Sequence, residues 1–186
     1  MNAPTKKGLA WLRQLALPTA SQQLRRDLLL EEIETLIRQV RRIEQQLNRQ
    51  AQQTPAVAQL RSIPGVGVRT AEAVTAFVDD PHRFRHAKAV GRYFGLVPCQ
   101  DQSGDRNRLG HITREGAPVV RQLVAEAAWQ AQRRSPTVRA YFERTQRGDP
   151  QRKKIALVAT AHYLVRLMWA MLQRGTLWEE KMVPAR

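Results

Sequence analysis

Cysteine, acidic residues and aromatic residues are all scarce in this sequence of 186 residues. Cys99 is the single cysteine, so the chain forms no internal disulfide, and its four histidines have no thiol partners for a usual zinc site. Asp and Glu number 16 against 31 Lys and Arg, which gives a formal net charge of +15. Aromatic residues make up 6% of the chain, too few to indicate a broad pocket for a flipped-out base. The scarcity of cysteine fits a reducing compartment.

The sequence also lacks a signal peptide and a run suited to cross a membrane. Its most apolar stretch, residues 155–172, contains His162 and Arg166 near the middle, which a lipid-facing helix tolerates poorly. We therefore interpret this stretch as a buried helix. The expected location is the cytoplasm, without a membrane partner.

The excess of positive charge indicates a protein that binds a polyanion. Residues 54–186 hold 22 Lys and Arg against 11 Asp and Glu, whereas residues 1–53 hold 9 against 5. Arginine greatly outnumbers lysine, and a planar guanidinium grips phosphate through two hydrogen bonds where an ammonium acts as a point charge. DNA is therefore the first candidate partner, and its binding is expected mainly in the second part of the chain.

Periodicity and turn residues predict a mainly α fold, in which a long helix precedes a compact helical domain. Residues 1–21 show no sustained period, so we expect an irregular lead-in there. Beyond it we expect a coiled-coil-like helix over 22–53, a DNA-binding domain over 56–178 and a tail over 179–186. The expected helices of the domain are 56–63, 69–78, 86–94, 116–134, 136–145 and 152–173. Short strands are candidates at 93–97 and 109–112.

The long helix carries a heptad pattern. Ile33, Val40 and Leu47 recur every seven residues, and the apolar residues Leu29, Leu36 and Ile43 fall three or four positions away. Leu30 and Ile37 widen this apolar stripe, which favours a helical hairpin or a multi-helix assembly over a simple two-stranded zipper. The pattern fits both a bundle element of the same chain and an arm that forms homo-oligomers.

A Pro-Gly-Val-Gly turn at 64–67 separates two short apolar helices and looks like a helix-hairpin-helix motif. Gly65 and Gly67 allow a tight turn and a close approach of the backbone to a ligand. Arg69 and Thr70 open the second helix, whose first amides and dipole suit a phosphate. The motif implies contact with the DNA backbone regardless of sequence, and the alternative is a plain turn between two helices.

Ser103 lies in a glycine-punctuated, arginine-rich segment that we expect to form an exposed loop. A hydroxyl can attack a phosphodiester when nearby cations neutralise the phosphate and its developing charge. The candidate cations are Arg106, Arg108, Arg114 and Arg121. Thr113 is expected to cap the following helix, with Gly116 in its first turn. Standing alone, the serine would be read as an ordinary turn residue on a basic loop.

The order of these motifs resembles the C-terminal transposase domain of the insertion-sequence one-ten family, which includes Piv-type DNA invertases and bridge-RNA-guided recombinases. The residues that carry the resemblance are Gly95-Leu96-x-Pro98, Ser103-Gly104, Gly110-x-Ile112-Thr113-Arg114-x-Gly116, Arg121 and a distal helix beginning at Lys153-Lys154. The resemblance implies a transposase that acts by phosphoryl transfer in DNA recombination. It further implies that Ser103 is the catalytic nucleophile, forming a covalent phosphoserine link to DNA.

In this family an N-terminal RuvC-like domain carries four acidic metal ligands, and a coiled-coil arm follows it. The resemblance therefore leads us to expect that this chain is a C-terminal half, which requires a RuvC-like domain or a full-length transposase as partner. We assign no metal to the chain and expect Mg²⁺ only with that partner. A structured guide RNA is a further partner that the family implies.

Two other functions remain open at this point. A truncated transposase that has lost its activity would act as a DNA-binding or oligomerising regulator, a role supported by the heptads and the basic surface. A base-excision glycosylase would combine the helix-hairpin-helix motif with an acid such as Asp79 or Asp80, although these residues precede Pro81 in a pattern typical of turns and caps. His111 and His162 are unassigned, and His162 is expected in the core.

Overall fold

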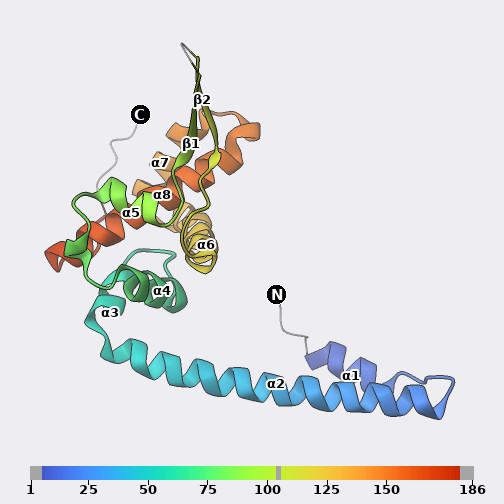
Figure 1. Ribbon diagram of the computed structural model, residues 1–186. Helices are drawn as coiled ribbons and strands as arrows, with labels where there is room; N and C mark the ends of the chain where they lie inside the picture. The colour runs from blue at the N-terminus through green and yellow to red at the C-terminus, as the bar shows by residue number, and fades with distance from the viewer. Residues whose placement is uncertain (1–5, 104–105, 181–186) are drawn as a thin grey trace. The chain divides into compact units, whose positions relative to one another are not determined.

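The computed structural model describes the backbone of residues 6–103 and 106–180, and the side chains of residues 7–99 and 110–180. The chain divides into two compact units, residues 1–50 and 51–186. Helices dominate both units, and the strands of the described residues form one two-stranded sheet, so the expected mainly α fold is confirmed (Figure 1).

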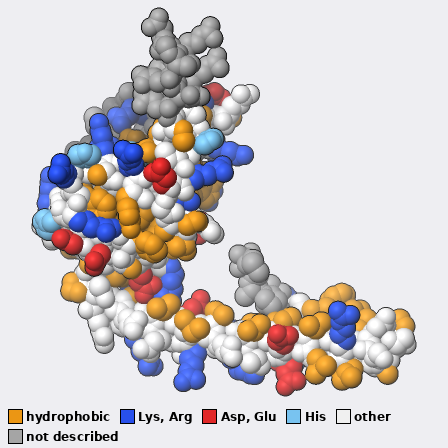
Figure 2. All heavy atoms as spheres, in the orientation of Figure 1, with side chains coloured by type: hydrophobic (Ala, Val, Ile, Leu, Met, Phe, Trp, Pro, Cys, Tyr) orange, Lys and Arg blue, Asp and Glu red, His pale blue; other side chains and the backbone are white. Residues whose placement is uncertain are grey.

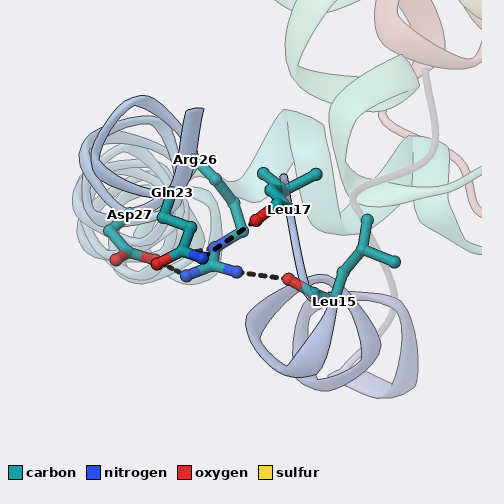
Figure 3. Close-up of polar contacts among 5 residues, drawn as sticks. All are labelled: Leu15, Leu17, Gln23, Arg26 and Asp27. Atoms are coloured by element: carbon teal, nitrogen blue, oxygen red, sulfur yellow. Dashed lines mark hydrogen bonds and ion pairs between the residues drawn. The ribbon is translucent and has the colours of Figure 1, made fainter. Parts of the chain in front are cut away.

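The first unit contains helix α1 (Lys6–Gln14) and most of helix α2 (Ala20–Gln53). The expectation of an irregular segment over 1–21 is wrong for α1. The physical reason is tertiary, because α2 supplies partners to this short helix and to the segment after it. Arg26 donates from Nη1 to the carbonyl of Leu15 at 2.5 Å, and Gln23 donates from Nε2 to that of Leu17 at 2.9 Å (Figure 3). Arg13 and Glu34 form an ion pair.

Helix α2 forms one continuous helix, as its heptads predict, and most of its apolar positions lie at the surface (Figure 2). Leu30 and Ala51 are buried, with 5% and 2% of each exposed, and Ile33 and Ile37 are half-buried. Leu36, Val40 and Ile43 are exposed by 51%, 52% and 59% respectively. The predicted seam of the coiled coil is thus available for packing along the second half of the helix.

The second unit begins with a helical hairpin, α3 (Pro55–Arg61) and α4 (Val68–Val78), followed by the short 3-10 helix η1 (Pro81–Arg83) and α5 (Ala87–Tyr93). Strands β1 (Pro98–Ser103) and β2 (Arg106–Ile112) come next. The remainder is helical, with α6 (Pro118–Arg134), α7 (Pro136–Gln146), the 3-10 helix η2 (Pro150–Arg152) and α8 (Lys153–Arg174). These helices lie within about two residues of their predicted bounds.

Helix α8 is the centre of this unit, and it packs against α3, α5, α6 and α7. By length and composition alone it could cross a membrane, but its apolar residues form the core of the unit. Leu164 and Met168 are fully buried, as are Leu60 and Phe94 from the surrounding segments. Burial of each such side chain contributes roughly 1.5–3 kcal/mol to folding. The helix expected over 152–173 is confirmed, and one face of its apolar stretch 155–172 is buried in the core of the unit.

The strands differ in part from those expected. Residues 109–112 lie within β2, but residues 93–97 form the end of α5 and a turn, and the strand that pairs with β2 is β1, in which Pro98 lies opposite Ile112. Helix α6 begins at Pro118, after the N-cap residue Ala117, so the prediction that Thr113 caps it is wrong. Pro118 fits the first helical position because that position needs no N–H, and Gly116 adopts a left-handed φ of 70° that cannot continue into a helix.

Hydrogen bonds join the two ends of the helical unit. Gln59 of α3 donates from Nε2 to the carbonyls of Met171 and Thr176, both at 2.6 Å. The amide of Trp178 donates to Ser62 Oγ at 2.9 Å. Glu180 accepts from the amide of Thr137 and from the Ser135 hydroxyl, both at 2.7 Å, and so completes the N-terminus of α7. Residues 179 and 180 of the expected tail therefore belong to the folded unit, and residues 181–186 lie outside the described residues.

Candidate nucleic-acid interface

The two glycines of the α3–α4 turn have different surroundings. Gly65 has a φ of 93°, and a Cβ atom built on it would lie 2.7 Å from the Cα atom of Ala131 and 2.8 Å from the carbonyl carbon of Gln130. Gly65 is therefore required for the turn to pack against the backbone of α6. This explains the glycine by contact within the protein, in place of the expected approach to a ligand.

Gly67 faces open space, since a Cβ atom there would meet nothing within 4 Å. It is the N-cap residue of α4, and no side chain caps the helix at this end. The first backbone hydrogen bond of the helix runs from Ala71 N to Gly67 O at 3.0 Å, so the amides of the first turn point out of the helix end. An uncapped, accessible helix N-terminus attracts anions through these amides and the helix dipole.

The side chains of Arg69 and Thr70 are engaged within the protein. The Arg69 guanidinium forms an ion pair with Glu72, with Nη1 and Oε2 separated by 2.6 Å. Thr70 is 6% exposed, and its hydroxyl donates to the carbonyl of Leu123 in α6 at 3.4 Å. The described geometry leaves Gly67 and the first-turn amides as the part of this motif best placed for a phosphate.

A groove with a volume of about 630 Å³ begins at this turn. We call it the Trp129 groove. Its walls come from α4, α6 and α8, and they comprise Gly65, Gly67, Thr70, Gln122, Ala125, Glu126, Ala127, Trp129, Gln130 and Leu157. The structure places Trp129 half-buried in the wall of this open groove.

The β1–β2 hairpin is fixed at its base by two glycines with left-handed backbones. Gly95 has a φ of 65°, and a Cβ atom there would lie 2.8 Å from the carbonyl carbon of Arg114. Gly116 has a φ of 70°, and a Cβ atom there would meet the carbonyl group of Tyr93. The amide of Thr113 donates to the carbonyl of Val97 at 2.9 Å. The spaced glycines of the sequence motif thus allow two chain segments to cross at close range.

Arg121 stabilises the same crossing. Its Nη1 atom donates to the carbonyls of Glu115 at 2.5 Å, Gly116 at 3.0 Å and Phe94 at 3.4 Å. Arg114 is exposed and has a φ of 58°, in the left-handed region, and its amide donates to the carbonyl of Gly95 at 3.2 Å. Arg121 therefore has a clear positioning role at the base of the hairpin, while Arg114 presents its side chain to solvent there.

Ser103 ends β1 and lies opposite Arg106 in the register of the hairpin, and Asp101 lies opposite Arg108. Their side chains lie outside the described residues. Ser103 is five positions after Pro98, and a strand rises about 3.3 Å per residue, which places the serine roughly 17 Å from the base. Arg106 and Arg108 therefore share the serine's end of the hairpin, whereas Arg114 and Arg121 lie near the other end. The predicted cluster of four arginines is divided in two along the strand pair.

Cations held on aromatic rings form a feature that sequence reasoning missed. The Arg133 guanidinium lies 4.6 Å, and the Lys153 ammonium 4.7 Å, from the centroid of the Trp129 ring. The spacing of Trp129 and Arg133, one helical turn apart, could have signalled the first contact. Lys153 comes from α8 and joins them only through the packing of α6 on α8. Lys and Arg side chains also occur at several places on the visible face of the unit (Figure 2).

The remaining titratable residues have structural surroundings. Asp80 accepts from the amide of His82 at 2.8 Å and caps η1, as its position before Pro81 predicts. His162 Nε2 is buried beside Gly91, without a hydrogen-bond partner among the described residues. Burial, and then the positive charge of Arg166, lower the pKa of His162. Within residues 6–103 and 106–180 no group of three or more His, Cys, Asp or Glu could hold a metal ion.

Comparison with known proteins bears directly on this arrangement. Residues 57–143, which run from α3 through the hairpin to α7, match the Transposase IS116/IS110/IS902 family. The chain is 30% identical over 162 residues to a probable family 20 transposase of Pseudomonas aeruginosa, an alignment that covers 86% of this chain and 48% of the relative.

Two further relatives are similar at the same level. An insertion element IS110 uncharacterized 43.6 kDa protein of Streptomyces coelicolor is 32% identical, over 77% of this chain and 35% of its own length. The transposase for insertion sequence element IS1111A of Coxiella burnetii is 32% identical, over 70% of this chain and 36% of its own length. The chain thus spans between about a third and a half of these relatives.

The matched residues include the glycine-fixed hairpin and Arg121, which carried the resemblance in the sequence, and also the α3–α4 turn, whereas the helix that begins at Lys153-Lys154 lies outside the match. They correspond to the C-terminal region of the family. The chain belongs to the IS116/IS110/IS902 family of transposases.

Proposed function

We propose that this chain is the DNA-binding, nucleophile-carrying part of a DNA transposase, and that Ser103 attacks the DNA strand. The observation that carries the proposal is the β1–β2 hairpin, whose base is fixed at Gly95 and Gly116 and whose register sets Ser103 opposite Arg106. A rigid base lets a hairpin present one residue at a defined place, which is what a reaction between a side chain and a phosphodiester requires.

The proposed reaction is a phosphoryl transfer. The Ser103 hydroxyl loses its proton as its Oγ atom forms a bond to the phosphorus, and the bond from phosphorus to one sugar oxygen breaks. The departing sugar oxygen takes up a proton, and the strand end remains esterified to the serine. A sugar hydroxyl of a second strand then reverses these steps and rejoins the DNA. Arg106 and Arg108 are the cations proposed to neutralise the phosphate, because they share the serine's end of the hairpin.

DNA is proposed to bind through the open N-terminus of α4 at Gly67, where backbone amides can contact phosphates of any sequence. Arg114 is the exposed cation at the base of the hairpin that supports this interface. From what the family implies, we also propose that the chain works with a RuvC-like domain that carries Mg²⁺, binds a structured guide RNA and is located in the cytoplasm.

The direct test is a search for a denaturant-resistant protein–DNA adduct. The chain is incubated with a recombination junction and a RuvC-like partner, and the adduct is expected with the unmodified chain and absent with Ser103→Ala. Ser21→Ala is the matched control, since Ser21 is exposed in α2, and it should leave the adduct unchanged. An adduct that persists in Ser103→Ala would exclude this serine as the nucleophile.

A second candidate is a regulator that binds DNA and oligomerises without cleaving a strand. The exposed apolar seam of α2 favours it, since Leu36, Val40 and Ile43 are about half exposed and suit a second copy of the chain. Charged substitutions at Val40 and Ile43 should then abolish both self-association in sedimentation experiments and the regulatory effect, while Ser103→Ala preserves both. If the serine variant loses the effect and the seam variants keep it, the regulatory function is excluded.

A further inference from the structure

The ring of Trp129, which lines the Trp129 groove, holds two positive charges. Arg133 follows Trp129 by one turn of α6, and Lys153 is the first residue of α8. Their charged groups lie 4.6 and 4.7 Å from the centroid of the same ring. A contact of this kind favours one position of a long, charged side chain over the others. The indole therefore restrains two cations that would otherwise move freely in solvent.

Neither cation is neutralised by an acid. Both side chains are exposed, and within residues 7–99 and 110–180 neither forms an ion pair. Glu126 also lines the groove and accepts a hydrogen bond from Gln122 at 3.0 Å. Two like charges held close together repel each other, and an anion beside them offsets this repulsion. The arrangement is therefore complementary to a polyanion.

The same groove continues to the open end of α4. Gly67 and Trp129 both line it, and so does Leu157, which lies one turn after Lys153 on α8. A strand that contacts the amides at Gly67 can follow this groove to the two cations. Because the lining of the groove includes both Gly67, at the open end of α4, and the Trp129 ring that holds the two cations, it fits an extended polymer of phosphates better than a single small anion.

We propose that the Trp129 groove is a binding site for the phosphodiester backbone of duplex DNA, in which Arg133 and Lys153, positioned by Trp129, contact phosphates. The proposal rests on DNA binding at Gly67 as described above and adds a second, separate set of phosphate contacts. Trp129 acts as a positioning residue, because it holds the cations and is not itself proposed to touch the bases.

The test is the salt dependence of binding by the full chain to a duplex of random sequence, followed by fluorescence anisotropy between about 50 and 200 mM salt. Each lost phosphate contact lowers the slope of log affinity against log salt by about one. Arg133→Gln with Lys153→Gln should therefore lower the slope by about two and weaken binding to all duplexes alike. Arg174→Gln is the matched control, as an exposed cation about 30 Å away at the other end of α8, and its slope should match that of the unmodified chain.

Variants of Trp129 separate the effect of the ring, which positions the two cations, from the effect of the charge of these cations. Trp129→Leu leaves the net charge unchanged yet should weaken DNA binding, and Trp129→Phe should restore most of it because the ring face is retained. Thermal unfolding checks that each variant is folded. If Trp129→Leu does not fold, the double variant of Arg133 and Lys153 tests the proposal by itself, because both of its substitutions are at exposed positions.

Several results would overturn the proposal. It fails if the double cation variant keeps the slope of the unmodified chain, if the unmodified chain shows no salt-dependent binding to duplex DNA, or if the variant loses affinity for structured RNA alone. The adduct experiment on Ser103 is scored separately. A Ser103-dependent adduct together with an unchanged slope would support the proposed function and reject the groove.

Discussion

Substitution by alanine should lower the stability of the fold strongly at one glycine of the α3–α4 turn and leave it nearly unchanged at the other. Gly65→Ala introduces a side chain at a φ of 93°, which costs about 1–2 kcal/mol, and sets a methyl group against the backbone of α6, which costs about 1–3 kcal/mol more. The backbone of α6 cannot yield as a flexible side chain would, because Ala131 is fully buried. The sum is about 2–5 kcal/mol, or a fall of roughly 10–20 °C in the unfolding midpoint of a unit of this size.

Gly67→Ala serves as the paired measurement. Gly67 has a φ of −81°, and the position that a methyl group would take there has no atom within 4 Å, so alanine adopts this backbone without strain. Its stability should stay within about 1 kcal/mol of the unmodified chain, since alanine is only a somewhat poorer N-cap than glycine. Thermal unfolding followed by circular dichroism measures both variants. The reasoning is refuted if Gly65→Ala unfolds within about 1 °C of the unmodified chain, or if Gly67→Ala is the less stable of the two.

Three further predictions concern the hairpin base and two titrating groups. Gly116→Ala should lose about 2–4 kcal/mol and the hydrogen-exchange protection of the Thr113 amide, whereas Gly148→Ala, with the same φ of 70° and an open surrounding, should lose only about 1–2 kcal/mol. Burial and Arg166 lower the pKa of His162 below 6.5, so on acidification the unfolded chain binds a proton before the folded chain does. The stability of the fold therefore decreases below that pH. His162→Gln should flatten this decrease when unfolding midpoints are measured against pH. Burial raises the pKa of Glu180, but hydrogen bonds from Thr137, Ser135 and Trp178 outweigh it and lower the pKa from 4.5 to about 2. The stability that the ionised group contributes above pH 4.5 is therefore lost as the pH falls toward 2. Glu180→Gln should remove this loss.

Each of these predictions has an opposing result. Equal losses for the alanine variants at positions 116 and 148 would show that the crossing at Tyr93 carries no packing constraint. An unchanged acid dependence in His162→Gln or Glu180→Gln would show that the group does not titrate differently in the folded and unfolded chain. Both substitutions remove a titrating group while nearly conserving side-chain size, so a change in the pH profile is separable from a uniform loss of stability.

The sequence predicts most of the helices because they depend on local periodicity and on turn residues. The heptads of α2, the Pro-Gly-Val-Gly turn and the apolar stretch of α8 each contain their own signal. The sequence also predicts where the glycines of the hairpin motif lie. Their purpose is visible only in the fold, because Gly65 packs on α6, more than sixty residues away, and Gly116 packs on the end of α5.

The first strand and the first helix escaped prediction for related reasons. Residues 98–103 contain no β-branched or aromatic residue and include proline and aspartate, which are depleted in strands, so the hairpin follows from the fixed crossing at its base. Helix α1 is short, and hydrogen bonds from α2 hold the segment that follows it. The cation pair on Trp129 joins residues of α6 and α8, a contact that no pattern within either helix encodes.

The bonds that Gln59 and Ser62 make with the segment after α8 have a consequence for local opening. Fraying of residues 176–180 would remove the acceptor at Thr176 and the donor at Trp178, and so would loosen the connection between α3 and α4. Opening of the last residues and opening of the turn are therefore one cooperative event, with a shared free energy. A nucleic acid that orders the turn would, by the same linkage, slow amide exchange at Trp178, on the far side of the sequence.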